Sequence, residues 1–150
     1  MGNKGFLVVG FAAALLVSFF YWEWFLSPEA RVRRALSSAA EAAEAVAVET
    51  FLSFVTDDYE DFVHPDRSSL EARVRASFDR VDRLNVTLKG IEIKVEADRA
   101  LARFDLVVVA IRGEERYVVA GTPFEPDKVK ATLERSEGAW RIRTVNREAY

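Results

Sequence analysis

The sequence NVTLKGIEIKV, residues 85–95, carries the strongest structural signal in the chain. Hydrophobic and polar residues alternate along it, as is typical of a strand with one buried face. The hydrophobic residues fall at even positions up to Leu88 and at odd positions from Ile91 onwards. Gly90 lies where the alternation changes phase. A β-bulge at Gly90 would absorb the extra residue and bend the strand. We therefore expect a long, bent strand in a curved sheet.

More strand-like segments follow this stretch. Short turns that contain glycine, aspartate or glutamate separate them, and this pattern favours antiparallel hairpins. The expected strands cover residues 101–111, 117–122, 129–133 and 140–145.

Helical patterns come before the strands. The tripeptide SPE at 27–29 suits a helix start, and no glycine or proline interrupts the helical spacing over 30–55. We expect one long helix over 30–55 that packs on the sheet, with a coiled-coil partner surface as the alternative. The sequence SSLE at 68–71 is a capping box with Ser68 as N-cap, and it predicts a shorter helix. Helices followed by antiparallel strands indicate an α+β domain over residues 27–150.

The N-terminal segment GFLVVGFAAALLVSFFYWEWFL begins at Gly5 and ends at Leu26. It has no charged residue up to Trp22, and a helix of about 18 residues covers roughly 27 Å, close to the thickness of a bilayer core. Its bulky aromatic end lacks a small-residue cleavage site, so an uncleaved signal-anchor is expected and a cleaved signal peptide is the alternative. The expected organisation is a tail at 1–4, one transmembrane helix at 5–26 and the domain.

The basic residues around this segment set the expected orientation. Lys4 precedes it, and Arg31, Arg33 and Arg34 follow it. A count of basic residues favours a cytoplasmic domain, whereas a very short basic N-terminus favours export. We expect a single-pass membrane protein with an extracytoplasmic domain, and the opposite orientation is the alternative.

The composition excludes several classes of function. The net charge is −3, whereas a general nucleic-acid-binding protein usually shows a basic face, so nucleic acid is not an expected partner. The chain has no cysteine, which excludes disulfides, thiolate metal sites and a cysteine nucleophile. We expect no metal and no cofactor.

An acidic run, DDYED at 57–61, lies between the two expected helices. It lacks the ligand spacing and the glycine of a calcium loop, so a solvated helix end or turn is expected. His64, the only histidine, precedes Pro65 in an expected turn. Without a second histidine, a cysteine or a nucleophile motif, the sequence assigns no catalytic residue.

Three stretches together carry a resemblance to a known family. FLSFVTDDYEDF at 51–62 ends an alanine-rich helix, NVTLKGIEIKV is the bent strand, and ATLERSEGAWRIRTVNRE at 131–148 is the closing strand pair. Over about residues 32–148 the chain resembles the nuclear transport factor 2-like superfamily, also called cystatin-like. The resemblance implies a cone in which a curved sheet wraps a long helix. That superfamily includes isomerases, cyclases and dehydratases, and also non-catalytic binding and assembly domains, so the fold alone does not decide activity.

The expected function follows from the groups that the cone would hold. The enzymes of that superfamily place Asp, His or Tyr groups inside the cone, but the inward positions here are mainly apolar, and Asp105 alternates to the other face. Residues that could line the pocket or its rim are Tyr59, His64, Tyr117 and Trp140. We expect a membrane-anchored, non-catalytic binding or assembly domain, like scaffold domains of bacterial secretion machines, with a protein partner or a homodimer formed through the sheet. The alternative is a small-molecule-binding protein or an enzyme of the isomerase, cyclase or dehydratase type.

Overall fold

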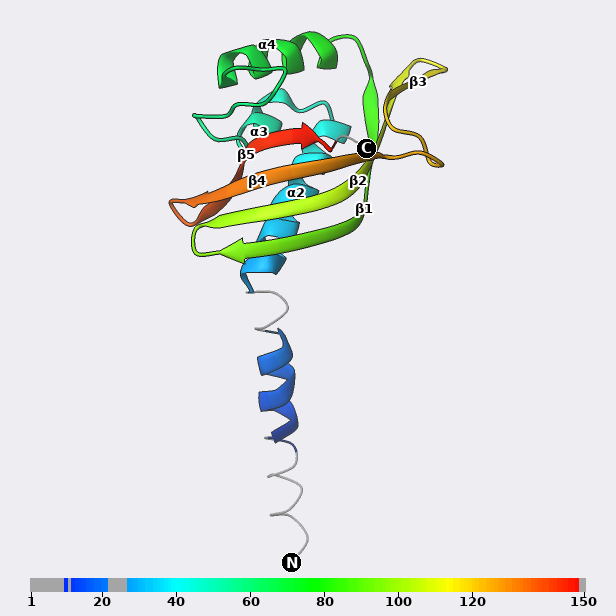
Figure 1. Cartoon of the computed structure of the whole chain (residues 1–150). Coiled ribbons are helices and arrows are strands. Elements are labelled where there is room, and N and C mark those ends of the chain that lie inside the picture. The colour runs from blue at the N-terminus through cyan, green and yellow to red at the C-terminus, as the bar shows by residue number, and fades with distance from the viewer. Residues whose placement is uncertain (1–9, 11, 22–26, 149–150) are drawn as a thin grey trace, which may run out of the picture.

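The computed structural model describes residue 10, residues 12–21 and residues 27–148. Helices pack on one face of an antiparallel five-stranded sheet (Figure 1), which confirms the α+β class. The helices are α2 (Pro28–Glu44), α3 (Val48–Leu52) and α4 (Arg67–Phe78), and the strands are β1 (Arg83–Glu96), β2 (Arg99–Arg112), β3 (Glu115–Ala120), β4 (Asp127–Ser136) and β5 (Ala139–Arg147).

The sheet is curved because its long strands bend. Its strand order is β1-β2-β4-β5, and β3 pairs with the end of β2 that β4 leaves free. The register between β1 and β2 shifts between Lys89 and Glu92, and Gly90 has a φ of 59°. Only glycine adopts this left-handed backbone without strain, so the residue that changes the hydrophobic phase also permits the bulge. The predicted bent strand is confirmed.

The expected long helix over 30–55 is wrong, because the chain leaves the helix after Glu44. The N–H of Ala47 donates to the carbonyl of Ala42 at 2.9 Å and the N–H of Val46 donates to Ala43 at 3.0 Å. These two bonds form a Schellman C-cap, in which Val46 takes the left-handed position with a φ of 48°. A β-branched residue is rare there, and nothing in the local sequence marks the break.

The start of α2 agrees with the sequence, whereas the start of α4 does not. Ser27 Oγ accepts a hydrogen bond from the N–H of Ala30 at 3.2 Å, as expected of an N-cap. In α4 the N-cap is Asp66, whose Oδ1 accepts from the N–H of Ser69 at 2.8 Å, so the expected cap Ser68 lies inside the helix. An aspartate is as good a cap as a serine, and it lies two residues earlier.

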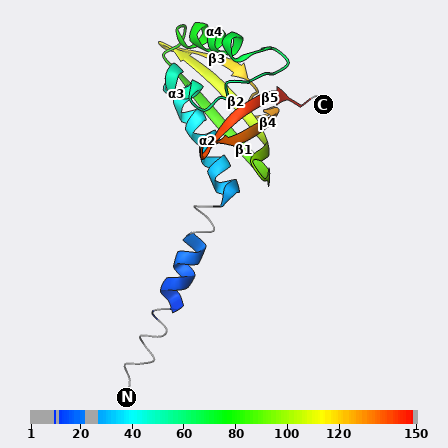
Figure 2. The same ribbon diagram turned by 90° about the vertical axis from the view of Figure 1, so that its left-hand side faces the viewer.

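The core lies between α2 and the sheet, whose strands β1, β2 and β4 cross α2 in Figure 1. The main core cluster contains buried residues of α2, of the segment after α3, and of strands β2, β4 and β5: Val32, Leu36, Ala39, Val55, Tyr59, Ala100, Ala102, Phe104, Val129, Ala131, Leu133, Trp140 and Ile142. A second cluster joins Ala43 of α2 to Val74 and Phe78 of α4. This second cluster lies towards α4, at the end of the domain away from the start of α2 (Figure 2).

The segment after α3 closes the edge of the sheet at β5. Val55 forms a parallel bridge with Ile142. The N–H of Thr56 donates to the carbonyl of Ile142 at 3.0 Å, and the N–H of Ile142 donates to Phe54 at 2.7 Å. The edge is therefore paired at this point, which protects it from pairing with another chain.

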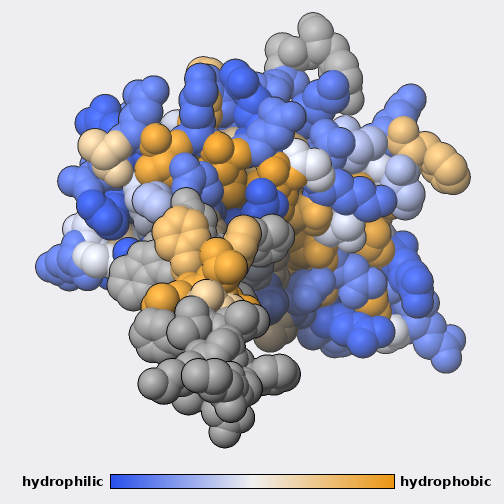
Figure 3. Space-filling view, turned by 90° about the horizontal axis from the view of Figure 1, so that it is seen from below, coloured by the Kyte–Doolittle hydropathy of each residue, from blue (hydrophilic) through white to orange (hydrophobic). Residues whose placement is uncertain are grey.

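Most of the expected transmembrane segment 5–26 lies outside the described residues. Gly10 and residues 12–21 are helical and exposed, and Figure 3 shows apolar side chains of this helix projecting in front of a largely hydrophilic surface. Within the described ranges, no helix is both long and apolar enough to span a bilayer.

Candidate functional site

A groove of about 430 Å³ lies between α4 and the sheet. We call it the α4 groove, and its apolar wall consists of Val74, Phe78, Val81, Leu84, Ala110, Tyr117 and Val119. Leu84 of β1, Ala110 of β2 and Tyr117 of β3 are cross-strand neighbours in the register, so they form a row across the sheet. The groove has the size and the apolar lining of a small-molecule site.

The inner end of the α4 groove is closed by the second core cluster. Phe78 packs edge-to-face against Phe51, with ring centroids 5.9 Å apart, and both rings belong to that cluster or pack against it. Beyond them the interior of the cone is occupied by the main core cluster. The open space is therefore a groove at one end of the cone and does not extend through it.

Basic side chains and one hydroxyl stand around the groove. Arg73 and Arg80 from α4 and the adjacent turn, and Arg112 from the end of β2, line it and are exposed, together with Ser77. The Tyr117 hydroxyl donates to Glu115 Oε2. No Asp, Glu or His is among the lining residues, so the groove holds no carboxylate or imidazole that could act as a general base.

The second notable cluster is Tyr59, Asp61 and His64, in the loop between α3 and α4. The Asp61 carboxylate accepts hydrogen bonds from the Tyr59 hydroxyl, from His64 Nδ1, and from the backbone N–H groups of Val63 at 2.7 Å and His64 at 2.6 Å. Its side chain is 8% exposed. The expectation of a solvated helix end or turn is therefore wrong for Asp61, because the nearby Tyr59 packs in the main core and its hydroxyl bonds to the Asp61 carboxylate.

Burial and hydrogen bonding shift two pKa values in this cluster. Burial is the main cause that raises the pKa of Tyr59, and the hydrogen bond to Asp61 and the charge of Asp61 add to it. Burial alone would raise the pKa of Asp61, but the hydrogen bonds from Tyr59, His64 and the backbone outweigh it and lower that pKa below its ordinary value. At neutral pH the cluster therefore holds a phenol and a carboxylate.

The four candidate pocket or rim residues fall in different places. Tyr117 lines the α4 groove. Tyr59 and Trp140 belong to the main core cluster, and His64 lies beside Asp61. The other lining residues of the groove were missed, because they come from α4 and three strands whose meeting depends on the curvature of the sheet.

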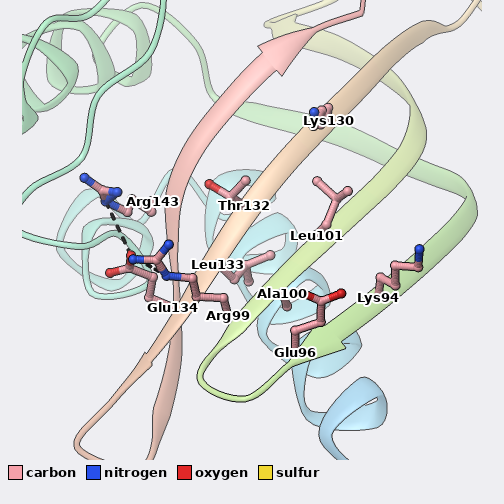
Figure 4. Close-up of a pocket in the computed structure, with 10 residues that line it drawn as sticks. All are labelled: Lys94, Glu96, Arg99, Ala100, Leu101, Lys130, Thr132, Leu133, Glu134 and Arg143. Atoms are coloured by element: carbon pink, nitrogen blue, oxygen red, sulfur yellow. Dashed lines mark ion pairs between the residues drawn. The ribbon is translucent and has the colours of Figure 1, made fainter.

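A smaller depression of about 380 Å³ lies on the outer face of the sheet, the face away from α2 (Figure 4). Glu134 in its lining pairs with Arg143 at 3.6 Å and with Arg99 at 3.9 Å, as the dashed lines show. Within the part of the chain that the structure describes, no group of three His, Asp or Glu side chains could hold a metal ion.

The fold matches many solved structures. A Bdellovibrio bacteriovorus protein, Bd1075, gives a TM-score of 0.65 at 12% identity over 79% of this chain, which spans 39% of the length of that protein. A Nostoc punctiforme protein of unknown function with a cystatin-like fold gives 0.61 at 19% identity, with 79% of this chain and 87% of that one covered. A candidate dehydratase of the NTF2-like family from Streptomyces avermitilis gives 0.61 at 15% identity, with 78% and 91% covered.

These likenesses confirm the expected nuclear transport factor 2-like, cystatin-like fold. No curated protein matches the chain in sequence. A family model described as the SnoaL-like domain matches residues 30–146, from α2 to the end of β5. Because the match covers most of the chain, this protein belongs to the SnoaL-like domain family.

Proposed function

We propose that this chain is a non-catalytic binding domain that holds an apolar small molecule in the α4 groove. The observation that carries the proposal is the lining: apolar side chains form the wall of a space of about 430 Å³, and no general base is among them. Such a site binds by burying the apolar surface of its ligand, which contributes about 25 cal/mol for each Å² removed from water.

An enzyme is the alternative function, and the names of two similar proteins include a dehydratase activity. The residues with the character of an acid–base cluster are Tyr59, Asp61 and His64. None of the three lines the α4 groove, so a ligand held there would not lie against them. The separation of the binding space from the acid–base cluster favours binding over catalysis.

The binding proposal is tested by titrating the full chain with a neutral apolar probe, 4-phenylbutanamide, and following the backbone amide signals by NMR. The signals of residues 74–81, 110 and 117–119 are expected to shift. Val119→Glu places a charge in the groove and is expected to abolish the shifts. Val118→Glu is the matched control, because Val118 is the preceding residue in β3, is 63% exposed against 57% for Val119, and is not a lining residue. Binding that survives Val119→Glu would refute the proposal.

We also propose that residues 5–26 attach this domain to a membrane. The support is the uncharged sequence from Gly5 to Trp22 and the exposure of Leu15, Phe19 and Phe20 in the described part of that segment. Membrane fractions washed with alkaline carbonate should retain the full chain and release a form that begins at Ser27. Protease treatment of intact spheroplasts would then show on which side the domain lies.

A partner bound to the outer face of the sheet, including a second copy of the chain, is a separate proposal. It is supported by the depression over β1, β2 and β4 in Figure 4, where Leu101 and Thr132 lie between charged side chains. Sedimentation of the full chain with Leu101→Lys, compared with the unmodified chain, tests it, because a sheet-face dimer should dissociate.

A further inference from the structure

We infer that the α4 groove binds an amphipathic anion, a molecule with an apolar body that ends in one carboxylate group. This inference rests on the proposed function and adds the chemical class of the ligand. It follows from the charge around the groove, because the three charged lining residues, Arg73, Arg80 and Arg112, all carry the same sign.

These three arginines are not used by the fold. None of their guanidinium groups forms an ion pair or a hydrogen bond with another part of the chain that the structure describes. Some arginines elsewhere have partners: Arg75 pairs with Glu49 at 2.6 Å, and Arg135 pairs with Asp98 at 2.6 Å. The groove therefore brings together three guanidinium groups whose hydrogen-bond donors are free to bind an anion.

Two acids close to Arg112 have hydrogen-bond partners other than Arg112. Glu115 is the cross-strand neighbour of Arg112, but it accepts the hydrogen bond of the Tyr117 hydroxyl. Asp82 Oδ2 accepts the N–H of Gly113 at 2.6 Å, which fixes the turn after β2. Neither carboxylate forms an ion pair with Arg112, so an incoming anion would not have to displace an internal one.

The chemistry of the lining then selects the class of ligand. A guanidinium group matches a carboxylate with two parallel hydrogen bonds, and such charge-assisted bonds are stronger than neutral ones. A neutral apolar ligand would fill the groove but leave these donors unused, and a cationic ligand would be repelled. The volume of about 430 Å³ suits a small molecule with an apolar body against Val74, Leu84 and Val119.

The test compares two probes of nearly the same shape, 4-phenylbutanoate and 4-phenylbutanamide, by NMR titration of the full chain. One carboxylate can pair with one or two of the three arginines, and exposed ion pairs are weak, so the acid is expected to bind about five- to tenfold more tightly than the amide. The preference should shrink when salt is raised, because exposed charges are screened. The triple variant Arg73→Gln, Arg80→Gln and Arg112→Gln should bind both probes equally.

The matched control removes three other arginines, with Arg31→Gln, Arg116→Gln and Arg141→Gln. It lowers the net charge by the same amount at residues that do not line the groove, and it should keep the preference for the acid. If it loses the preference too, net charge and not the groove is responsible, and the inference fails. Equal binding of both probes to the unmodified chain, with shifts in the groove residues, would also overturn the inference but leave the proposed function intact. If neither probe shifts those residues, the proposed function itself fails.

Discussion

Nδ1 of His64 lies 2.9 Å from Oδ2 of Asp61, at the turn that leads from the core-facing Tyr59 to α4. The same carboxylate accepts the hydroxyl of Tyr59, which is only 4% exposed. One acid therefore satisfies a buried phenol on one side and a half-buried imidazole on the other. This relationship makes Asp61 a structural residue of the loop.

Asp61→Ala is expected to lower the free energy of unfolding by about 2–4 kcal/mol. The substitution leaves the buried Tyr59 hydroxyl without its acceptor, and a buried polar group left unpaired costs about 1–3 kcal/mol. It also removes the acceptor of the N–H groups of Val63 and His64. Urea-induced unfolding of the full chain measures the change.

The control is Asp58→Ala, since Asp58 is 62% exposed and pairs only with Arg143 at the surface. A loss of no more than about 1 kcal/mol is expected there. In a Tyr59→Phe background the cost of Asp61→Ala should fall, because the hydroxyl that needed an acceptor is gone. Equal costs in both backgrounds would show that the Tyr59–Asp61 bond contributes nothing.

The Asp61 cluster also predicts a dependence on pH. Hydrogen bonds lower the pKa of Asp61 in the folded chain below the ordinary value of 3.8, against the opposing effect of burial. A lowered carboxylate pKa adds stability that is complete above about pH 4 and is lost as the pH falls through the folded pKa. The difference in unfolding free energy between the unmodified chain and Asp61→Asn should therefore be constant from pH 5 to 7 and narrow below about pH 4. A difference that stays constant down to pH 3 would contradict this assignment.

The bent strand was predictable because its cause is local. Alternation changes phase at Gly90, and the same residue provides the positive φ that a bulge requires. The break of the long helix at Val46 was not predictable, since a valine in the left-handed region is held there by bonds to Ala42 and Ala43 and not by its own preference.

The environment of Asp61 depends on a contact that the local sequence does not show. The sequence DDYED has the composition of a solvated turn. Asp57 is indeed 98% exposed, and Asp61 is buried only because Tyr59 inserts into the core beside it. The α4 groove could not be predicted for the same reason, because its wall also depends on contacts between distant parts of the chain. Its wall joins residues 73–84 to residues 110–119, and these meet because the sheet curves towards α4.

Gly121 is expected to tolerate no side chain. Its φ is 59°, and a Cβ there would lie 2.4 Å from the carbonyl oxygen of Leu106 and 2.6 Å from the backbone nitrogen of Asp127. Gly113 is the matched control, with a φ of 60° and open space around the same position. Gly113→Ala should cost only the left-handed strain, about 1–2 kcal/mol. Gly121→Ala should cost at least about 2 kcal/mol more, because the backbone at residue 121 must also move away from Leu106 and Asp127. Equal melting temperatures of the two variants would contradict the close approach of Gly121 to Leu106 and Asp127.

Trp140→Ala is expected to be among the most destabilising single changes in the domain. Trp140 is 5% exposed and lies in the main core cluster with Val32 and Leu36 of α2. Truncation of a buried aromatic residue costs about 3–5 kcal/mol, a large part of the stability of a small domain.

Trp140→Phe separates the packing of the ring from its polar interactions. Within the described residues the buried indole Nε1 has no hydrogen-bond partner, so its removal breaks no such bond. The contact that would weaken is the guanidinium of Arg135, which lies 5.9 Å from the ring centroid and contributes about 0.5–1 kcal/mol at an exposed site. Trp140→Phe should therefore lose about 1–2 kcal/mol, from this contact and the smaller ring. Thermal unfolding of both Trp140 variants measures the two losses of stability. Phe124→Ala is the control, because its ring is 95% exposed and its removal should hardly change the melting temperature. If Trp140→Ala melts within a degree or two of the unmodified chain, β5 does not press this ring against α2.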